Sequence, residues 1–182
     1  FRSETGQDSQ DQVEKDLAEH KLQWKRGLAD AAMFKRHLRQ LHIYVLQYGA
    51  EVEVVPRPFD GFSLVHTSLS GGMEIETDGQ RVHVAEGGSA LLSPRNRVTL
   101  RWHPGTVQMI LRVPHALMRD AIGMPPDTPL DLIPLMRLNA GDEQQWALLA
   151  RSFLHALSQS DAPSPQAPWL DHLEKHIALF LL

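Results

Sequence analysis

Hydrophobic and polar residues alternate along much of residues 60–114, and this alternation predicts a succession of short β-strands. Asp78 and Gly79 separate two of these segments and are typical of a two-residue hairpin turn. Glycine or proline bounds most of the others. The predicted strands are residues 62–67, 73–77, 80–84, 90–92, 98–102 and 107–113. Together they predict a small antiparallel barrel or sandwich.

The segments before residue 60 predict one helix and two more strands. Ser9 is a good N-cap for a helix that begins at Gln10 or Asp11, because its hydroxyl can accept a bond from the first turn. A helical stripe on this segment contains Val13, Leu17, Lys21 and Trp24. Residues 41–46 are rich in β-branched and aromatic side chains, and we expect them to pair with residues 51–55 after a turn at Gly49.

Helices are predicted after residue 114. Proline suits a first helical turn and glycine a helix end, so a short helix should run from Pro114 to Gly123, with Leu117, Met118 and Ile122 inward. A proline-rich connection spans residues 125–134. Two amphipathic helices then follow, one from Gly141 and one from Pro168, separated by a linker at residues 160–165.

The apolar stripes of these last two helices must be covered, since burial of each large apolar side chain contributes about 1.5–3 kcal/mol. They can pack on each other and on the strands, and part of their surface can also pair with a second copy of the chain. The two arrangements are compatible. The candidate dimer-interface residues are Trp146, Leu149, Phe153, Leu157, Leu173, Ile177 and Phe180.

Composition favours one domain with appended helices. The chain has 182 residues, is 42% hydrophobic and carries a net charge of -4, so it lacks the basic surface expected of a nucleic-acid-binding domain. It contains no cysteine, and therefore no disulfide framework or thiolate metal site. The sequence has no apolar run of transmembrane length and no signal segment at its start, which predicts a cytoplasmic chain without membrane contact.

The histidines do not predict a metal centre. No His-x-His pair occurs, and His66, His83 and His103 fall on separate predicted strands, whereas a metal site needs at least three converging ligands. His172 and His176 are four residues apart on a predicted helix, but Glu174 stands at neither position of the zinc-protease motifs. The sequence also lacks a nucleophile elbow and a phosphate-binding glycine loop. We therefore expect no metal, no cofactor and no catalytic residue.

A small-molecule pocket inside the barrel should be mainly apolar, with a few polar groups. Alternation places five candidates inward, although a one-residue register error would exchange them for their neighbours. For an aromatic carboxylate, an arginine or His66 would contact the carboxylate and an aromatic side chain would stack on the ring. The same side chains can instead fill a closed core. The candidate ligand-binding residues are Tyr44, Leu64, His66, Trp102, Met109, Arg36 and Arg101.

The order of these parts resembles a known family. The relevant motifs are Leu69-Ser70-Gly71, Asp78-Gly79, Gly87-Gly88, Leu91-Leu92-Ser93-Pro94 and Leu111-Arg112-Val113-Pro114, followed by two helices. The arrangement is similar to the N-terminal effector-binding and dimerisation domain of AraC/XylS-type transcription regulators of bacteria.

The resemblance implies a mainly β fold: a cupin-like antiparallel barrel of the jelly-roll type that binds a small effector, here one of the aromatic class as a candidate. It also implies a C-terminal helical hairpin that mediates homodimerisation, and a helix-turn-helix domain that binds promoter DNA and would follow residue 182. The corresponding parts of this chain are residues 1–29 as a helical segment docked on the barrel, residues 30–123 as the barrel, and residues 124–182 as linker and hairpin.

Two other functions stay open on the sequence. A cupin-like barrel can be a small-molecule enzyme, although the metal motif is missing. The chain can also be a dimerisation module that binds no ligand. A cavity with converging polar groups would favour sensing, and a barrel filled by side chains would favour the dimerisation module.

Overall fold

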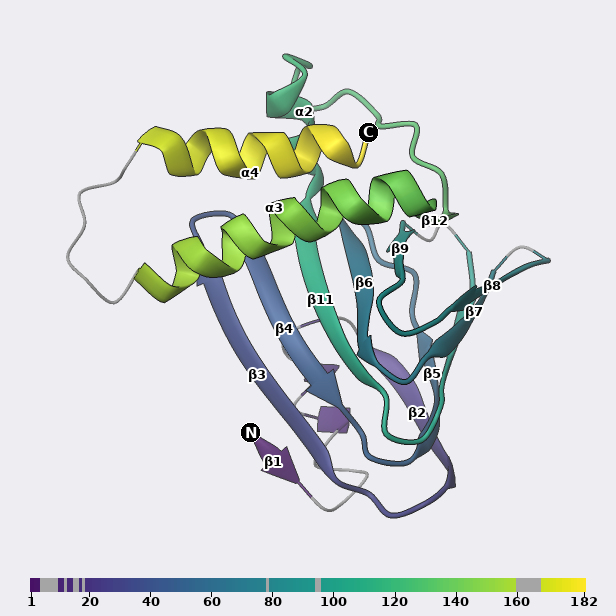
Figure 1. The fold of residues 1–182 in the computed structure, drawn as a ribbon. Coiled ribbons are helices and arrows are strands. Elements are labelled where there is room, and N and C mark those ends of the chain that lie inside the picture. Colours follow the sequence, from purple (N-terminus) through teal and green to yellow (C-terminus); the bar gives the residue numbers. More distant parts are fainter. Residues whose placement is uncertain are drawn as a thin grey trace.

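Two antiparallel sheets face each other in the computed structural model, and helices cover the outer side of the larger sheet (Figure 1). The structure describes residues 1–3, 10, 11, 13, 14, 17, 19–77, 79–93, 96–159 and 168–182. The predicted cap at Ser9, the turn residue Asp78 and the linker at residues 160–165 lie outside the described residues. The described part contains no helix long and apolar enough to cross a membrane.

The larger sheet has seven strands in the order β1-β3-β4-β11-β6-β9-β12. These strands are β1 (Arg2–Ser3), β3 (Ala31–Leu38), β4 (Leu41–Gln47), β6 (Phe62–Ser70), β9 (Ser89–Leu92), β11 (Val107–Pro114) and β12 (Leu135–Arg137). The smaller sheet has the order β2-β5-β10-β7-β8. Its strands are β2 (His20–Arg26), β5 (Glu51–Pro56), β7 (Met73–Thr77), β8 (Gln80–Val84) and β10 (Val98–Trp102). The helices are α2 (His115–Ala121), α3 (Ala140–Gln159) and α4 (Pro168–Phe180).

The alternating segments of residues 60–114 form strands β6 to β11 as predicted. Strands β7 and β8 pair as the expected hairpin, with Thr77 opposite Gln80. The predicted mainly β, antiparallel fold is therefore confirmed. The two sheets do not close on each other, so a sandwich describes the arrangement better than a barrel.

The leading segment was predicted incorrectly in its second half. Gln10, Asp11, Val13 and Glu14 are helical, but Lys21 and Trp24 belong to strand β2, which pairs with β5. The residues of β2 therefore form an edge of the smaller sheet. Strand β3, which flanks β4, was not predicted.

The predicted pairing of residues 41–46 with residues 51–55 is wrong. Both segments are strands, yet β4 pairs with β3 and β11 in the larger sheet, whereas β5 pairs with β2 and β10 in the smaller one. The chain crosses between the sheets at Gly49, whose φ of 77° suits glycine and whose missing side chain leaves room for Asp30.

Helix α2 follows Pro114 as predicted, and Gly123 adopts a positive φ of 69° just beyond its end. Leu117 and Met118 are buried, but Ile122 is exposed, contrary to the prediction. One short strand that was not predicted, β12, follows the proline-rich connection and pairs with β9.

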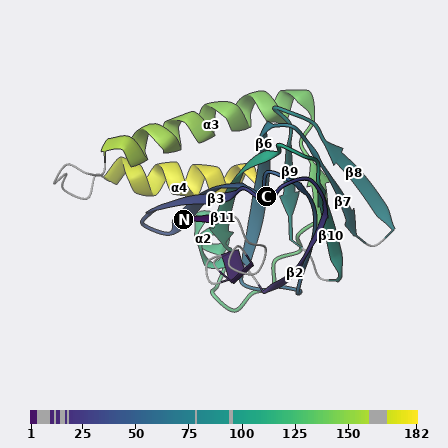
Figure 2. The ribbon, with the colours of Figure 1, turned by 90° about the horizontal axis from the view of Figure 1, so that it is seen from below.

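Two separate cores lie on the two faces of the larger sheet. The first fills the space between the sheets and includes Leu46, Leu64 and Trp102. The second lies between the larger sheet and the helices, and includes Met109 and Phe153. Figures 1 and 2 show α3 and α4 side by side on this outer face. The strands in the middle of the larger sheet are thus buried on both faces, as in sheets covered by helices.

Helix α4 is tied to the turn between β3 and β4 by a buried carboxylate. Glu174 is fully buried, and its Oε1 atom accepts hydrogen bonds from the backbone N–H groups of Gln40 (2.9 Å) and Leu41 (3.1 Å). Burial raises the pKa of Glu174, and the two backbone hydrogen bonds oppose that shift. The contact positions α4 over the edge of the larger sheet.

Candidate functional site

An apolar cavity of about 40 Å³ lies between the two sheets. Strands β2, β4, β5, β6, β9, β10 and β11 line it, together with the leading segment, Tyr48 after β4 and the coil before β6. The lining residues are Val13, Leu17, His20, Leu46, Tyr48, Val54, Pro56, Phe59, Leu64, His66, Leu92, Leu100, Trp102 and Ile110. Its lining is mainly apolar and includes a few polar side chains.

Two of the lining side chains have buried polar atoms without a hydrogen-bond partner among the described residues. His66 is 2% exposed, and neither of its ring nitrogens is bonded. Trp102 is also 2% exposed, and its indole N–H donates to no described acceptor. Buried polar atoms are nearly always paired in folded proteins, so these atoms are unusual and mark the polar part of the cavity wall.

Two titratable side chains that line the cavity, His66 and Tyr48, are uncharged near pH 7. Burial lowers the pKa of His66 to about 4, because the charged imidazolium would lose its hydration. Burial also raises the pKa of Tyr48, so its phenol stays protonated. Among the described lining residues none is Arg, Lys, Asp or Glu. The cavity therefore presents apolar walls and a few neutral hydrogen-bonding groups.

The structure brings together three of the seven predicted ligand-binding residues, Leu64, His66 and Trp102, around this cavity. Tyr44 lies in the same core but does not line the cavity. Met109 was placed on the wrong face: it belongs to the core beneath the helices, and its neighbour Ile110 lines the cavity instead.

The two predicted arginines lie away from the cavity. Arg36 is exposed on β3. The Arg101 guanidinium forms ion pairs with Glu53 and Glu76, both at 3.3 Å, and these three residues alternate with the inward-facing residues of their strands. Neither arginine is among the residues that line the cavity.

Sequence reasoning missed the residues that reach the cavity from outside the alternating strands. Phe59 comes from the coil before β6, and Val13 and Leu17 come from the leading segment. Their apolar character was the available signal, but coil residues have no periodicity to show which way they point.

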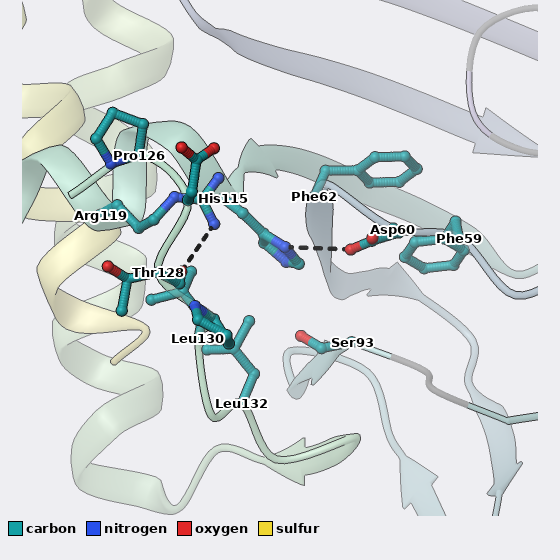
Figure 3. A pocket seen from close by; sticks show the side chains of 12 residues that line it. Phe59, Asp60, Phe62, Ser93, His115, Arg119, Pro126, Thr128, Leu130 and Leu132 are labelled. Carbon is teal, nitrogen blue, oxygen red and sulfur yellow. Dashed lines mark hydrogen bonds and ion pairs between the residues drawn. The ribbon is translucent and has the colours of Figure 1, made fainter. Parts of the chain in front are cut away.

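A larger surface pocket of about 460 Å³ lies next to the cavity, and Phe59 lines both. Figure 3 shows His115 facing Asp60 at its edge, with Ser93 nearby. His115 Nδ1 is 3.9 Å from Asp60 Oδ1, and His115 Nε2 is hydrogen-bonded to Ser63 Oγ at 3.0 Å. Ser63 Oγ is in turn bonded to Ser93 Oγ at 2.6 Å. The order Asp, His, Ser resembles that of a hydrolase triad.

The geometry of this group does not support nucleophilic catalysis. Ser63 is fully buried and cannot meet a substrate. The Asp60 carboxylate is fully exposed and too far from His115 for a hydrogen bond. Burial lowers the pKa of His115, although the charge of Asp60 opposes that shift. We interpret the group as a structural link between β6, α2 and the strand end at Ser93.

The predicted dimer-interface residues pack within the chain. Trp146, Phe153, Leu157 and Ile177 are buried in the core beneath the helices, and the other three predicted residues pack against it. The outer surface of the helices has a different set of apolar side chains. The exposed ones are Leu148, Leu154, Trp169 and Leu179.

Two of the three histidines treated as isolated on the sequence lie together. The His83 and His103 rings stack with centroids 5.8 Å apart, whereas His66 lies inside the cavity. Separate strands can therefore bring histidines together although no short spacing reveals it.

Comparison with known proteins settles the family. Residues 9–182 match the family model of the AraC-binding-like domain. The chain belongs to this family. No curated protein matches its sequence. Among solved structures, the AraC-like transcriptional activator CuxR is similar, with 14% identity and a TM-score of 0.67, over 88% of this chain and 59% of that chain. This AraC-binding-like chain therefore spans little more than half the length of CuxR.

Cupin domains are more distantly similar. The cupin domain of Cnp3 from Schizosaccharomyces pombe is 16% identical with a TM-score of 0.40, over 58% of this chain and 76% of that chain. A cupin domain of an XRE-family transcriptional regulator from Enterobacter cloacae is 9% identical with a TM-score of 0.37, over 45% of this chain and 92% of that chain.

Proposed function

We propose that this AraC-binding-like domain is the regulatory part of a bacterial transcription regulator. It binds a small effector between its two sheets, forms a homodimer and thereby controls promoter binding by a C-terminal domain. Family membership supports the regulatory role. The observation that carries effector binding is the apolar cavity into which His66 and Trp102 bring buried, unpartnered polar atoms.

The effector is neutral and mainly apolar, with one or two polar atoms. The Trp102 indole requires a hydrogen-bond acceptor, and neutral His66 offers one donor and one acceptor. A carboxylate would be buried without an arginine or lysine among the described lining residues, which carries a large desolvation cost. A phenol, aldehyde or ester fits these walls better than the aromatic acid considered from the sequence.

Binding requires parts of the wall to move. Ligand pockets usually measure about 300–1,000 Å³, whereas this cavity measures about 40 Å³. Val13 and Leu17 of the leading segment and Phe59 of the coil before β6 line the cavity from outside the sheets, in addition to Tyr48 directly after β4. An effector that displaces them changes how the leading segment packs on the domain, and this differential contact is the source of the switch.

Strand β6 connects the cavity to the helices. His66 faces the cavity, and the next residue, Thr67, accepts a hydrogen bond at 2.8 Å from the indole N–H of Trp146 in α3. Thr67 Oγ1 is also bonded to Ser89 Oγ at 2.9 Å. A displacement of His66 on effector binding would therefore move the adjacent Thr67 and, through its hydrogen bond to Trp146, helix α3.

Thermal unfolding of the 182-residue chain tests effector binding. The panel pairs neutral phenols, aldehydes and esters with carboxylates of the same size. At a hundred times its dissociation constant, a ligand stabilises the folded state by about 2.7 kcal/mol, or roughly 5–10 °C for a domain of this length. We expect a saturable shift with neutral compounds that is lost in Trp102→Phe and His66→Leu.

A shift that persists unchanged in both variants would place the ligand elsewhere. No shift across the panel would favour the second candidate function, a dimerisation module without a ligand. The small volume of the cavity is the observation that favours this second candidate. Full-length protein with and without a binding compound then tests control of promoter affinity.

The dimer contact is assigned to the outer surface of α3 and α4, because the predicted residues are already used inside the chain. Trp169 is 51% exposed and Leu148 is 59% exposed. Sedimentation velocity should show a dimer that Trp169→Asp or Leu148→Asp weakens. Leu28→Asp is the matched control, since Leu28 is exposed but lies between β2 and β3, away from the helices. A monomeric wild type, or equal weakening by the control, would contradict the assignment.

A further inference from the structure

Two imidazoles and one carboxylate meet at the smaller sheet, apart from the cavity. Glu74 lies on β7, His83 on β8, and His103 directly follows β10. One ligand atom from each of these side chains lies within 4.8 Å of the others. None of the three residues lines the cavity between the sheets.

Sheet register brings these side chains together. Glu74 is directly opposite His83 in the β7–β8 pair, and Trp102 is opposite Met73 in the β7–β10 pair. The backbone N–H of His103 donates to the carbonyl of Gly72 at 3.0 Å, which continues this pairing by one residue. The ligands are therefore held by paired strands, and their backbone positions do not depend on a free loop.

Gly72 keeps space beside this group. A Cβ atom at this position would lie 3.0 Å from the Val84 carbonyl oxygen and 3.6 Å from the His83 ring. The His83 and His103 rings lie nearly parallel, with an interplanar angle of 28°. Both rings can thus turn a nitrogen toward Glu74 without displacing backbone.

The chemistry of the set suits a divalent metal ion. Two histidines and a glutamate form a three-ligand set used by zinc sites that keep one position open. Zinc bonds of about 2.0–2.2 Å in tetrahedral geometry require ligand atoms about 3.3–3.5 Å apart. The ligand atoms lie within 4.8 Å of one another, so their separations must shorten by at most about 1.5 Å. Side-chain rotation can supply this because His83 is exposed and Glu74 is half-buried.

Competition for the carboxylate is weak. Arg101 Nη1 lies 3.9 Å from Glu74 Oε2, and both side chains are about one-third exposed or more. Such ion pairs contribute little to stability. The guanidinium also pairs with Glu53 and Glu76, so it keeps partners when Glu74 turns toward a metal ion.

The geometry points to a binding site for a late first-row divalent metal ion, with Glu74, His83 and His103 as ligands and Zn²⁺ as the probe. Imidazole nitrogens favour this class of metal over Mg²⁺ or Ca²⁺. The bound ion joins the β7–β8 hairpin to the end of β10 and so stabilises the smaller sheet. The site shares no residue with the lining of the cavity.

The experiment is calorimetric titration of the metal-free chain with Zn²⁺, followed by Co²⁺ absorption spectra that report the ligand set. The site variants are His83→Ala, His103→Ala and Glu74→Gln. The control is the double variant His172→Ala/His176→Ala, which removes two exposed histidines four residues apart on α4. Thermal unfolding without metal shows whether each variant is folded.

We expect one Zn²⁺ per chain and a Tm that rises with the Zn²⁺ concentration. Each site variant should bind Zn²⁺ at least ~10-fold more weakly, because loss of even the outer partners of metal ligands weakens metal binding by about this factor. The control should bind as the wild type does. Absence of stoichiometric binding, loss of binding in the control, or wild-type affinity in the site variants would overturn the proposal.

Discussion

Replacement of His66 by leucine should stabilise the domain while it abolishes the response to effector. Leucine has a similar size but no polar atoms, so it removes a buried donor and a buried acceptor that lack partners among the described residues. An unsatisfied buried group costs about 1–3 kcal/mol, and the two together correspond to a gain of at least ~2 kcal/mol. For a domain of this length, the Tm should rise by roughly 4–8 °C.

The same substitution should change the pH dependence of stability. The folded-state pKa of His66 is about 4, below the ordinary value of 6.5. Between these values the unfolded chain binds more protons than the folded one, so stability falls as the pH falls through this window. The loss from this side chain amounts to about 2 kcal/mol between pH 7 and pH 4.5. The leucine variant should lack that part of the loss.

Urea denaturation at pH 7 and pH 4.5 measures both effects. The quantity of interest is the difference between the wild type and the variant, because carboxyl groups titrate in both proteins. His155→Leu is the control, since His155 is exposed on α3 and its removal should change neither quantity. A leucine variant less stable than the wild type at pH 7, or equally sensitive to acid, would refute the reasoning from unpartnered nitrogens.

Other predictions concern the contacts that hold the layers together. Glu174→Ala leaves two backbone N–H groups of the β3–β4 turn without an acceptor and should lower the free energy of unfolding by about 2–4 kcal/mol. Urea denaturation measures this loss, and a loss below about 1 kcal/mol would contradict the prediction. Thr106→Val removes two hydrogen bonds to the backbone of Gly72 and should cost about 1–3 kcal/mol, with a lower midpoint at an unchanged m-value. Phe153→Ala should cost about 3–5 kcal/mol because Phe153 is buried beneath the helices, whereas Leu148→Ala on the exposed face should change stability by less than about 0.5 kcal/mol.

The sequence predicted the fold best where one face of a strand is buried. In β10, buried and half-buried residues alternate strictly, and Trp102 was accordingly assigned to the interior. In β11, four consecutive residues are buried because one face meets the cavity and the other meets the helices. When both faces of a strand are buried, alternation does not show which face a residue is on. This explains why Met109 was predicted to face inward, whereas Ile110 lines the cavity.

The errors outside the central strands have a different cause. Lys21 and Trp24 were spaced as on a helix, yet pairing with β5 makes this segment an edge strand. Whether such a segment forms a helix or a strand depends on strands that are far away in the chain. Distant strands likewise determine that β4 and β5 belong to different sheets. The meeting of His83 with His103 and the entry of Phe59 into the cavity wall likewise depend on contacts that no local spacing records.

The position of the larger sheet between two cores has a consequence for local opening of the fold. Strands β6 and β11 have a paired neighbour on each side, one core above and another below, so their amide hydrogens should exchange with solvent slowest. Strands β2 and β8 form the two edges of the smaller sheet and should open first. Transient loosening of β2 would give a small molecule access to the space between the sheets while the helical layer stays folded.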